Sequence, residues 1–461
     1  MRRRFYSYVP LLCALWLSGC AAPAVPVETY LSRQTVPDRW DAAAALGNAP
    51  AEGSASAQWW RVFGDQRLDG LVDLALARNL DLHIAMLRVR QARNDARLMG
   101  TILTPEFTPS ATGGVTKDLA HGNPSQRDYS SRFDVGYELD LWGKYGAAID
   151  GADWALQASQ YDRRAAALTL VASVAETYWT IALLKQKVEI QARNIERASR
   201  LITLILARRQ SGFAGTADTE RAAQDLATQR IVARQLASQL HTTRLGLAAL
   251  LGEEAGWVNP LEPLALPTEP PPDVALDQPA AVLARRPDVQ AAEARLRASY
   301  SRAEVTRLQF YPTILLGAGR SGGASRDLGD ILSNPLGSLG FTLALPFLQF
   351  RKAQFTVTQA QLQYEEVGLQ FGRTLYNALI EVERGLAVAL QQRDEGALRQ
   401  AVLDRARKVE SISGARYLAG QDGLKDWLDA QQSTRQAESD VLDNRYEQLR
   451  TTLRLIQAMG G

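Results

Sequence analysis

The feature that most constrains the fold is an internal repeat, whose two copies lie about 207 residues apart. The first copy begins with Asn-Leu-Asp-Leu at residues 79–82, and the second begins with Arg-Pro-Asp-Val at residues 286–289. At identical internal spacing, two arginines, an alanine and a proline follow each start: Arg88, Arg90, Ala96 and Pro105, then Arg295, Arg297, Ala303 and Pro312. The repeat predicts one body made of two similar halves, before any single motif is considered.

A second matched pattern lies further along each copy. Its members are an arginine, a glycine, an aspartate and an alanine at the same spacing: Arg208, Gly212, Asp218 and Ala222, then Arg416, Gly420, Asp426 and Ala430. Glycine adopts a positive φ without strain, so it is favoured where a helix ends in a tight turn. We therefore expect Gly212 and Gly420 to form the turns of two helical hairpins.

Long proline-free stretches on both sides of these glycines predict long helices. Prolines are absent from 125–259 and from 347–461, and proline is the residue that a helix interior tolerates least. Apolar residues recur every seven positions in the first stretch: Val174, Ile181, Val188, Ile195 and Ile202, then Leu226, Ala233, Leu240 and Leu247. Such spacing is typical of helices that pack along their length. We expect hairpins at about 146–252 and 350–459, and a helix of about 60 residues would be about 90 Å long.

Alternating apolar and polar residues precede each hairpin and predict strands. The clearest alternation lies at 132–141 and 338–347, and each run follows a weaker, glycine-rich candidate strand, giving strand pairs at about 107–142 and 311–347. A half-buried sheet of a soluble protein is one explanation. The other is that four strands of about ten residues cross an outer membrane at a tilt. One chain has too few strands to close a barrel, so several chains would then share it.

The N-terminus has the arrangement of an export signal. Three arginines precede an apolar stretch that ends in Leu17-Ser18-Gly19-Cys20. This ending resembles a bacterial lipoprotein box, which predicts a signal peptide at 1–19 and a lipid on Cys20; an ordinary signal peptide with an incidental cysteine is the alternative. Removing three arginines and no acid lowers the net charge from +2 to −1. A chain this close to neutral is not expected to bind nucleic acid.

These observations divide the chain into five parts. After the signal we expect a lipidated tether at 20–58, the first repeat at 59–258, a Pro-rich connection at 259–278 and the second repeat at 279–461. The three histidines are scattered, and neither cysteine follows residue 20. We therefore expect no metal, no cofactor and no catalytic residues, and we interpret the chain as not an enzyme.

Taken together, these motifs resemble those of the TolC and OprM type of outer-membrane efflux proteins, in particular the lipoproteins that serve resistance-nodulation-division pumps. The likeness covers nearly the whole mature chain, and three short motifs carry it: Tyr137-Glu138-Leu139-Asp140-Leu141-Trp142-Gly143-Lys144, Arg285-Arg286-Pro287-Asp288-Val289 and Arg416-Tyr417-Leu418-Ala419-Gly420. The resemblance implies a mainly helical fold with some β-structure. Three chains would form an α-barrel of long helical hairpins and a shared 12-stranded β-barrel.

The same resemblance implies a functional site at the hairpin tips. Asp426 and Asp429 match aspartates that line the periplasmic aperture, and Tyr417 and Asp218 match residues that hold it shut. A ring of carboxylates would favour cations. The alternative for Asp218 and Asp426 is capping of the helix that follows the turn. Asp422 departs from the family pattern, because a related channel has an arginine there, and this acid cannot pair with Asp218.

The function implied is that of the outer-membrane channel of a tripartite export system. It would be a homotrimer in the outer membrane with a large periplasmic part, and it would passively conduct drugs or other small molecules. Its partners would be a periplasmic adaptor (a membrane fusion protein), a resistance-nodulation-division transporter of the inner membrane, and outer-membrane lipid. The alternative is a structural coiled-coil envelope lipoprotein without a pore. The strands discriminate between the two, because a spacer does not need them.

Overall fold

The computed structural model describes residues 24–32, 35–41, 58–117, 119–120, 124–257, 259–272, 274, 277–325 and 335–461. The predicted signal at 1–19 and the predicted lipid attachment at Cys20 lie outside these residues. By its contacts the chain forms two compact units. Unit 1 contains 1–35, 88–160 and 291–373, and unit 2 contains 36–87, 161–290 and 374–461. Each unit takes segments from both repeats, so the units do not correspond to the two halves of the sequence.

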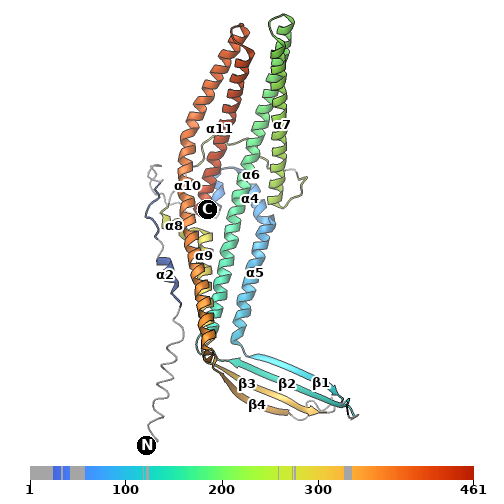
Figure 1. Ribbon diagram of the computed structural model, residues 1–461, viewed down its shortest axis with the longest axis vertical. Coiled ribbons are helices and arrows are strands. Elements are labelled where there is room, and N and C mark those ends of the chain that lie inside the picture. Colours follow the sequence, from blue (N-terminus) through green and yellow to red (C-terminus); the bar gives the residue numbers. More distant parts are fainter. Residues whose placement is uncertain are drawn as a thin grey trace. The chain divides into compact units, whose positions relative to one another are not determined.

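A four-stranded antiparallel sheet is the main feature of unit 1 (Figure 1). Each repeat contributes one pair of strands, and the strands lie side by side in sequence order: β1 (Glu106–Thr116), β2 (Gln126–Glu138), β3 (Thr313–Ser325) and β4 (Pro335–Ala344). The second strand of each pair is the run with the clear alternation. That run ends earlier than expected in both repeats, and after β4 a short 3₁₀ helix, η4 (Pro346–Leu348), begins at a proline that has no amide to continue the ladder.

One face of this sheet is apolar and open. Residues directly opposite one another share a face, and the register places Phe107, Val135, Ala318 and Leu339 in one row across all four strands. Phe341 lies in the neighbouring row. Exposure is 62% for Phe107, 89% for Leu339 and 74% for Phe341. Within the described residues, β1 and β4 each pair on one side only, so both edges of the sheet are open.

The helices of unit 1 approach closely because they carry small residues. In α9 (Pro287–Leu308) the buried positions include Ala294 and Ala298. A methyl group added to Gly151, in α6 (Lys144–Gln210), would lie 3.1 Å from Cβ of Ser301. Helix α6 contains a window apolar enough to span a membrane, but 61% of that window is buried inside the protein. Small side chains at such an interface let helix backbones come together, so α6 and α9 approach closely at Gly151.

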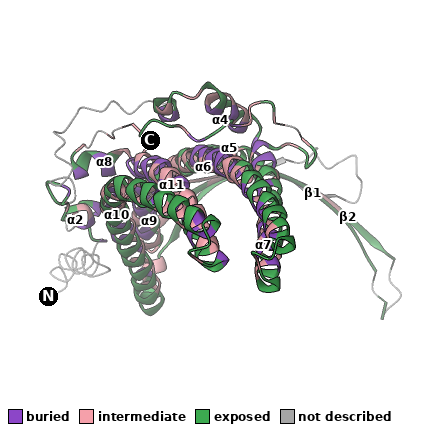
Figure 2. Ribbon diagram, turned by 90° about the horizontal axis from the view of Figure 1, so that it is seen from above, coloured by how far each residue is buried: buried purple, intermediate pink, exposed green. Residues whose placement is uncertain are grey.

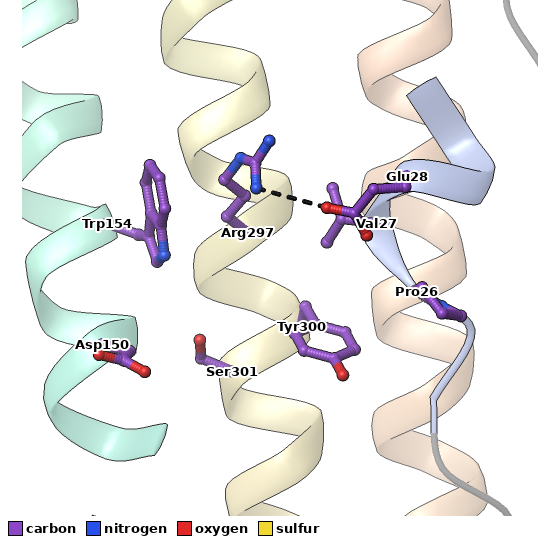
Figure 3. A pocket seen from close by; sticks show the side chains of 8 residues that line it. All are labelled: Pro26, Val27, Glu28, Asp150, Trp154, Arg297, Tyr300 and Ser301. Atoms are coloured by element: carbon purple, nitrogen blue, oxygen red, sulfur yellow. Dashed lines mark ion pairs between the residues drawn. The ribbon is translucent and has the colours of Figure 1, made fainter. Parts of the chain in front are cut away.

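The N-terminal segment 24–32, named here the strap, packs on the helices of unit 1. It contains α2 (Val27–Ser32), whose buried Tyr30 lies edge-on to Tyr364 with ring centroids 5.3 Å apart. Figure 3 shows Glu28 directed toward Arg297, with an oxygen–nitrogen distance of 3.8 Å, beside a cavity of about 220 Å³. The Arg297 guanidinium also lies 5.0 Å from the ring centre of Trp154. The strap is therefore held by aromatic packing and by charge.

Unit 2 consists mainly of two long helical hairpins. The first is formed by the second part of α6 with α7 (Thr216–Leu251), and the second by the corresponding part of α10 (Phe350–Leu418) with α11 (Leu424–Ala458). Exposed residues cover much of α7 and α10 (Figure 2). The main core lies at the other end of the hairpins, where Trp179 is 1% exposed. Shorter elements complete the part of the chain that the structure describes: η1 (Trp59–Phe63), α4 (Gln66–Arg78), α5 (Leu80–Gly100), η2 (Thr101–Leu103) and α8 (Pro279–Arg285).

The two repeats close their hairpins in the same way at the junctions α4–α5 and α8–α9. Asn79 follows α4, and its Nδ2 donates to the carbonyl of Leu250 near the end of α7 at 2.9 Å. Arg286 follows α8, and its Nη1 donates to the carbonyl of Ala458 at the end of α11 at 2.6 Å. Both side chains are buried. The terminal carbonyls of a helix lack partners within it, so in each repeat the junction residue ties down the end of the returning helix.

Candidate functional site at the hairpin tips

The two hairpin tips have nearly the same backbone. Gly212 and Gly420 have φ angles of +80° and +74°, as the sequence led us to expect for turn residues. The amide of Phe213 donates to the carbonyl of Arg208 at 2.8 Å, and the amide of Gln421 donates to that of Arg416 at 2.9 Å. These are the bonds of a Schellman motif, which ends a helix through a left-handed residue. The repeat therefore extends to individual backbone hydrogen bonds.

Side chains from both hairpins meet behind these turns in a small apolar cluster. Its buried members are Leu201, Ile205, Ala222, Tyr417 and Leu424. The guanidinium carbon of Arg208 lies 5.0 Å from the ring centre of Tyr417, and Nη1 of Arg208 donates to the carbonyl of Leu418 at 3.2 Å. Arg208 therefore connects the end of α6 to the end of α10 by a cation–π contact and a hydrogen bond.

Tyr417 is a packing residue within the single chain. It is 5% exposed, and its ring lies 5.5 Å from that of Trp427. Burial raises the pKa of the Tyr417 phenol above its ordinary value; the charge of Arg208 opposes this shift, and the charge of Asp218 adds to it. Its hydroxyl is buried without a hydrogen-bond partner among the described residues. Asp218, the other residue predicted to hold the aperture shut, is near enough to raise this pKa but accepts its hydrogen bond from Gly215.

Asp218 caps α7. Its Oδ2 accepts a hydrogen bond from the amide of Gly215 at 3.2 Å, and the amide of Asp218 donates to the carbonyl of Gly215, also at 3.2 Å. These reciprocal bonds satisfy groups that the start of a helix leaves unpaired. Arg221 lies 3.6 Å from its other oxygen. The capping role that the sequence left open is therefore present in the structure.

Asp422 has a partner within its own turn. Oδ2 of Asp422 lies 2.9 Å from Nε of Arg416. Arg416 and Arg208 are the two arginines near this turn that could replace the missing arginine of a latch to Asp218. In this chain Arg416 pairs with Asp422 and Arg208 stacks on Tyr417, so each arginine has another role.

Asp426 and Asp429 lie together on the exposed side of α11, whereas Leu424 and Ala430 are buried. The Nζ of Lys425, which precedes Asp426, lies 2.8 Å from Oδ2 of Asp429. Sequence reasoning did not identify this lysine, although a lysine four residues before an aspartate is a recognisable helical pair. It also did not predict the roles of Arg208 and Arg286, since nothing in the spacing shows what a long side chain will reach.

The described residues contain no group of three or more histidine, cysteine, aspartate or glutamate side chains that could hold a metal ion. The tips instead combine exposed carboxylates, arginines with partners and a small apolar cluster. Such an arrangement can attract or repel ions and hold two hairpins together.

Comparisons with known proteins agree with this description. The sequence model of the outer membrane efflux protein family matches the chain twice, at 71–253 and 279–461. The chain is similar to the pyoverdine export outer membrane protein OpmQ of Pseudomonas aeruginosa, with 29% identity over 97% of this chain and 95% of OpmQ. It is also similar to the toluene efflux pump outer membrane protein TtgC of Pseudomonas putida, with 27% identity over 89% of this chain and 86% of TtgC.

Among solved structures, the outer-membrane channel OprN has a similar fold. The TM-score is 0.82 at 23% identity, and the match covers 93% of this chain and 97% of OprN. Long helical hairpins with four strands per chain, in a twice-repeated sequence, are confirmed as the fold class. The chain is an outer-membrane efflux channel protein. With both halves matched and most of its length covered, it belongs to the outer membrane efflux protein family.

Proposed function

We propose that three copies of this chain form a lipid-anchored outer-membrane duct. The duct passively conducts small molecules delivered by a periplasmic adaptor and an inner-membrane resistance-nodulation-division transporter. It has no catalytic activity of its own. The related proteins are named for the export of compounds as different as pyoverdine and toluene. That range supports a conduit whose cargo is selected mainly by its pump.

The observation that carries this proposal is the open sheet. Lipid does not satisfy backbone polar groups, so a sheet spans a membrane only when its edges are closed. Here β1 and β4 are open among the described residues, and the row from Phe107 to Leu339 is apolar and exposed. Joining β4 of one copy to β1 of the next closes twelve strands in three copies. This closure removes the open edges and turns the apolar row toward lipid.

A stripe on α10 supports the same assembly. Apolar residues recur every seven positions and are exposed in the single chain: Phe355 (71%), Leu362 (54%), Leu369 (75%) and Tyr376 (46%). Seven-residue spacing is the pattern of a helix that packs lengthwise on a partner. We assign this stripe to contact with a helix of a neighbouring copy, which explains why these side chains are left uncovered within one chain.

The lipid anchor is proposed on Cys20, after removal of residues 1–19, with the tether at 20–58 following it. The amide of Ala24 donates to Oε1 of Glu304, near the end of α9, at 3.4 Å. Four residues span at most about 14 Å, so Cys20 is within that reach of Ala24. Because β3 begins at Thr313, shortly after α9 ends, a lipid there would enter the membrane close to the sheet.

The aperture is proposed at the hairpin tips, with Asp426 and Asp429 lining it and Gly212 and Gly420 at its turns. The exposure of both aspartates supports this assignment. Tyr417 and Asp218 are proposed to contribute to the closed state, with Arg208 between the hairpins. Residues 59–258 and 279–461, joined at 259–278, are the two repeats that build the duct.

Single-channel recording in planar bilayers, together with native mass spectrometry, tests the duct. We expect trimers and discrete pores, with lower cation preference in the Asp426→Ala/Asp429→Ala double variant. Asp73→Ala/Asp81→Ala removes the same charge from exposed positions of α4 and α5, and should behave as wild type. Pores unaffected by the first double variant would remove both aspartates from the aperture. Folded monomers without pores would favour the coiled-coil spacer instead.

A further inference from the structure

We propose that Lys425 sets the ion selectivity of the aperture by neutralising one of its two aspartates in every copy of the chain. This inference rests on the proposed function, because it needs the exposed side of α11 to line the pore. It goes beyond that function in assigning a role to a cation between two carboxylates. The resulting constriction carries one net negative charge per chain instead of two.

The three charged residues share one side of α11. At about 100° per residue, Lys425, Asp429 and Asp426 lie within an arc of about 100°. All three are exposed, while Leu424 and Thr434 are buried on the other side of the helix. A side of the helix that carries Asp426 and Asp429 to the pore therefore carries Lys425 with them.

The ion pair gives the two aspartates different electrostatic surroundings. Nζ of Lys425 lies 2.8 Å from Oδ2 of Asp429, a charge-assisted hydrogen bond four residues apart on the helix. No lysine or arginine forms an ion pair with Asp426 among the described residues. Lys425 thus compensates Asp429 by direct contact and acts on Asp426 only at longer range, so Asp426 provides most of the remaining negative charge.

Because of its position, this ion pair affects the passage of ions more than it affects the stability of the fold. An exposed ion pair contributes little to folding, because water and salt screen it. In a narrow pore, low-dielectric walls concentrate the field of fixed charges on the passing ion. A lysine that matters little for stability can therefore decide how strongly the ring attracts cations.

At the same hairpin tip, an aspartate about one turn earlier also has a cationic partner. Asp422 pairs with Arg416 at 2.9 Å within the turn itself. Two of the three aspartates between Gly420 and Ala430 thus have a cationic partner, and Asp426 is the exception. Weak net charge at this tip is consistent with a duct that passes molecules of different charge.

The test compares reversal potentials of wild type, Lys425→Met, Lys425→Arg and Lys408→Met under a KCl gradient. Lys408→Met is the matched control, since it removes the same charge from an exposed position on α10, more than two turns before its end. We expect Lys425→Met to raise the cation-to-anion permeability ratio roughly twofold and to increase block by divalent cations. Lys425→Arg and Lys408→Met should resemble wild type.

Salt concentration sharpens the result. The difference between Lys425→Met and wild type should be largest near 0.1 M salt, where the Debye length is about 10 Å, and should shrink near 1 M, where it is about 3 Å. Equal cation-to-anion selectivity of Lys425→Met, Lys408→Met and wild type would overturn the inference. The proposed duct would still stand in that case if wild type forms pores and Asp426→Ala changes their selectivity. Absence of pores in the wild type would overturn the duct and this inference together.

Discussion

The two repeats use the same backbone plan with different side-chain chemistry, and the junctions show this most clearly. In the first repeat the neutral Asn79 ties the end of α7 with one amide hydrogen bond. In the second, Arg286 ties the end of α11 and also binds two carboxylates, with Nη2 2.8 Å from Asp288 and 2.7 Å from Glu381. The corresponding residue thus closes the corresponding hairpin in each half, but only in the second half does that residue itself carry a charge; in the first half the charge lies on its neighbour Arg78, which pairs with Glu253 just after α7.

The two hairpin tips likewise share a backbone conformation and differ in side-chain chemistry. The turn backbones match, yet Asp218 caps α7 in the first tip, whereas at the corresponding position of α11 Asp426 is exposed beside Lys425. A duplicated backbone fixes where side chains start, while their identities decide what they reach. The first tip is therefore mainly structural, and the second carries most of the residues proposed to act on ions.

The largest expected difference between the repeats is at the junctions. Arg286→Ala leaves the Ala458 carbonyl unpaired and two carboxylates without their cation, so we expect local stability near the end of α11 to fall by about 2–3 kcal/mol. The partial exposure of Asp288 and Glu381, at 43% and 56%, keeps the loss below that of a fully buried pair. Asn79→Ala should cost about 1–2 kcal/mol near the end of α7.

Hydrogen–deuterium exchange in the last turns of α11 and α7 measures both effects. Arg302→Ala is the control, because this exposed arginine of α9 lies away from the junction in sequence. Equal losses in Arg286→Ala and Asn79→Ala would show that charge adds nothing to the second junction.

A smaller difference is expected between the two arginines of the tips. Arg208→Ala removes a cation–π contact and a hydrogen bond between the hairpins, so we expect a loss of about 1–2 kcal/mol at both tips. Arg416→Ala breaks an exposed pair within one turn and should cost less than about 1 kcal/mol, at the second tip alone. Amide exchange at 201–222 and 413–430 separates these outcomes, with Arg209→Ala as the neighbouring control. A loss confined to the first tip in Arg208→Ala would contradict the bridging role.

The smallest expected difference between the two junctions is in how strongly acid destabilises them. Burial raises the pKa of Asp288, but the hydrogen bonds and charge of Arg286 outweigh it, so this pKa lies below its ordinary value of 3.8. The stabilisation by Asp288 is therefore fully present above the unfolded pKa and is lost as pH falls through the folded pKa, below 3.8. Asn79 does not titrate.

Amide exchange measured from pH 6 down to pH 2, corrected for intrinsic rates, tests this sign. In a Glu253→Gln background, which removes the Arg78–Glu253 ion pair beside α7, the end of α11 should lose protection at a higher pH than the end of α7, and Asp288→Asn should abolish the difference. Loss of protection at one common pH in both hairpins would contradict a charge-specific second junction.

Much of the architecture could be predicted from local chemistry. Proline-free stretches and seven-residue spacing indicated the hairpins of α6–α7 and α10–α11, and glycine spacing indicated the turns at Gly212 and Gly420. The strands were recognised, but their bounds were less accurate. Polar and glycine-rich residues extend β2 back to Gln126 and β3 on to Ser325, where alternation is weak and pairing with neighbours provides the stabilisation.

The side-chain partners at the tips needed the three-dimensional structure. Spacing alone indicates that Arg208 and Arg416 are equivalent, yet one stacks on Tyr417 and the other pairs with Asp422. Long arginine and lysine side chains reach several possible partners, and small differences in packing select among them. The Asp218 cap is local, so sequence could offer it as an alternative, and the structure contains it.

The repeat, the long helices, the turns and the family could be recognised in the sequence, because these depend on periodicity and on backbone preferences that act over short distances. Three further features became visible only in the folded chain: Asn79 and Arg286 close the hairpins, Arg208 joins the tips, and Lys425 compensates Asp429. The physical reason is that each of these contacts depends on the reach and burial of a side chain. Those quantities exist only once distant segments have packed together.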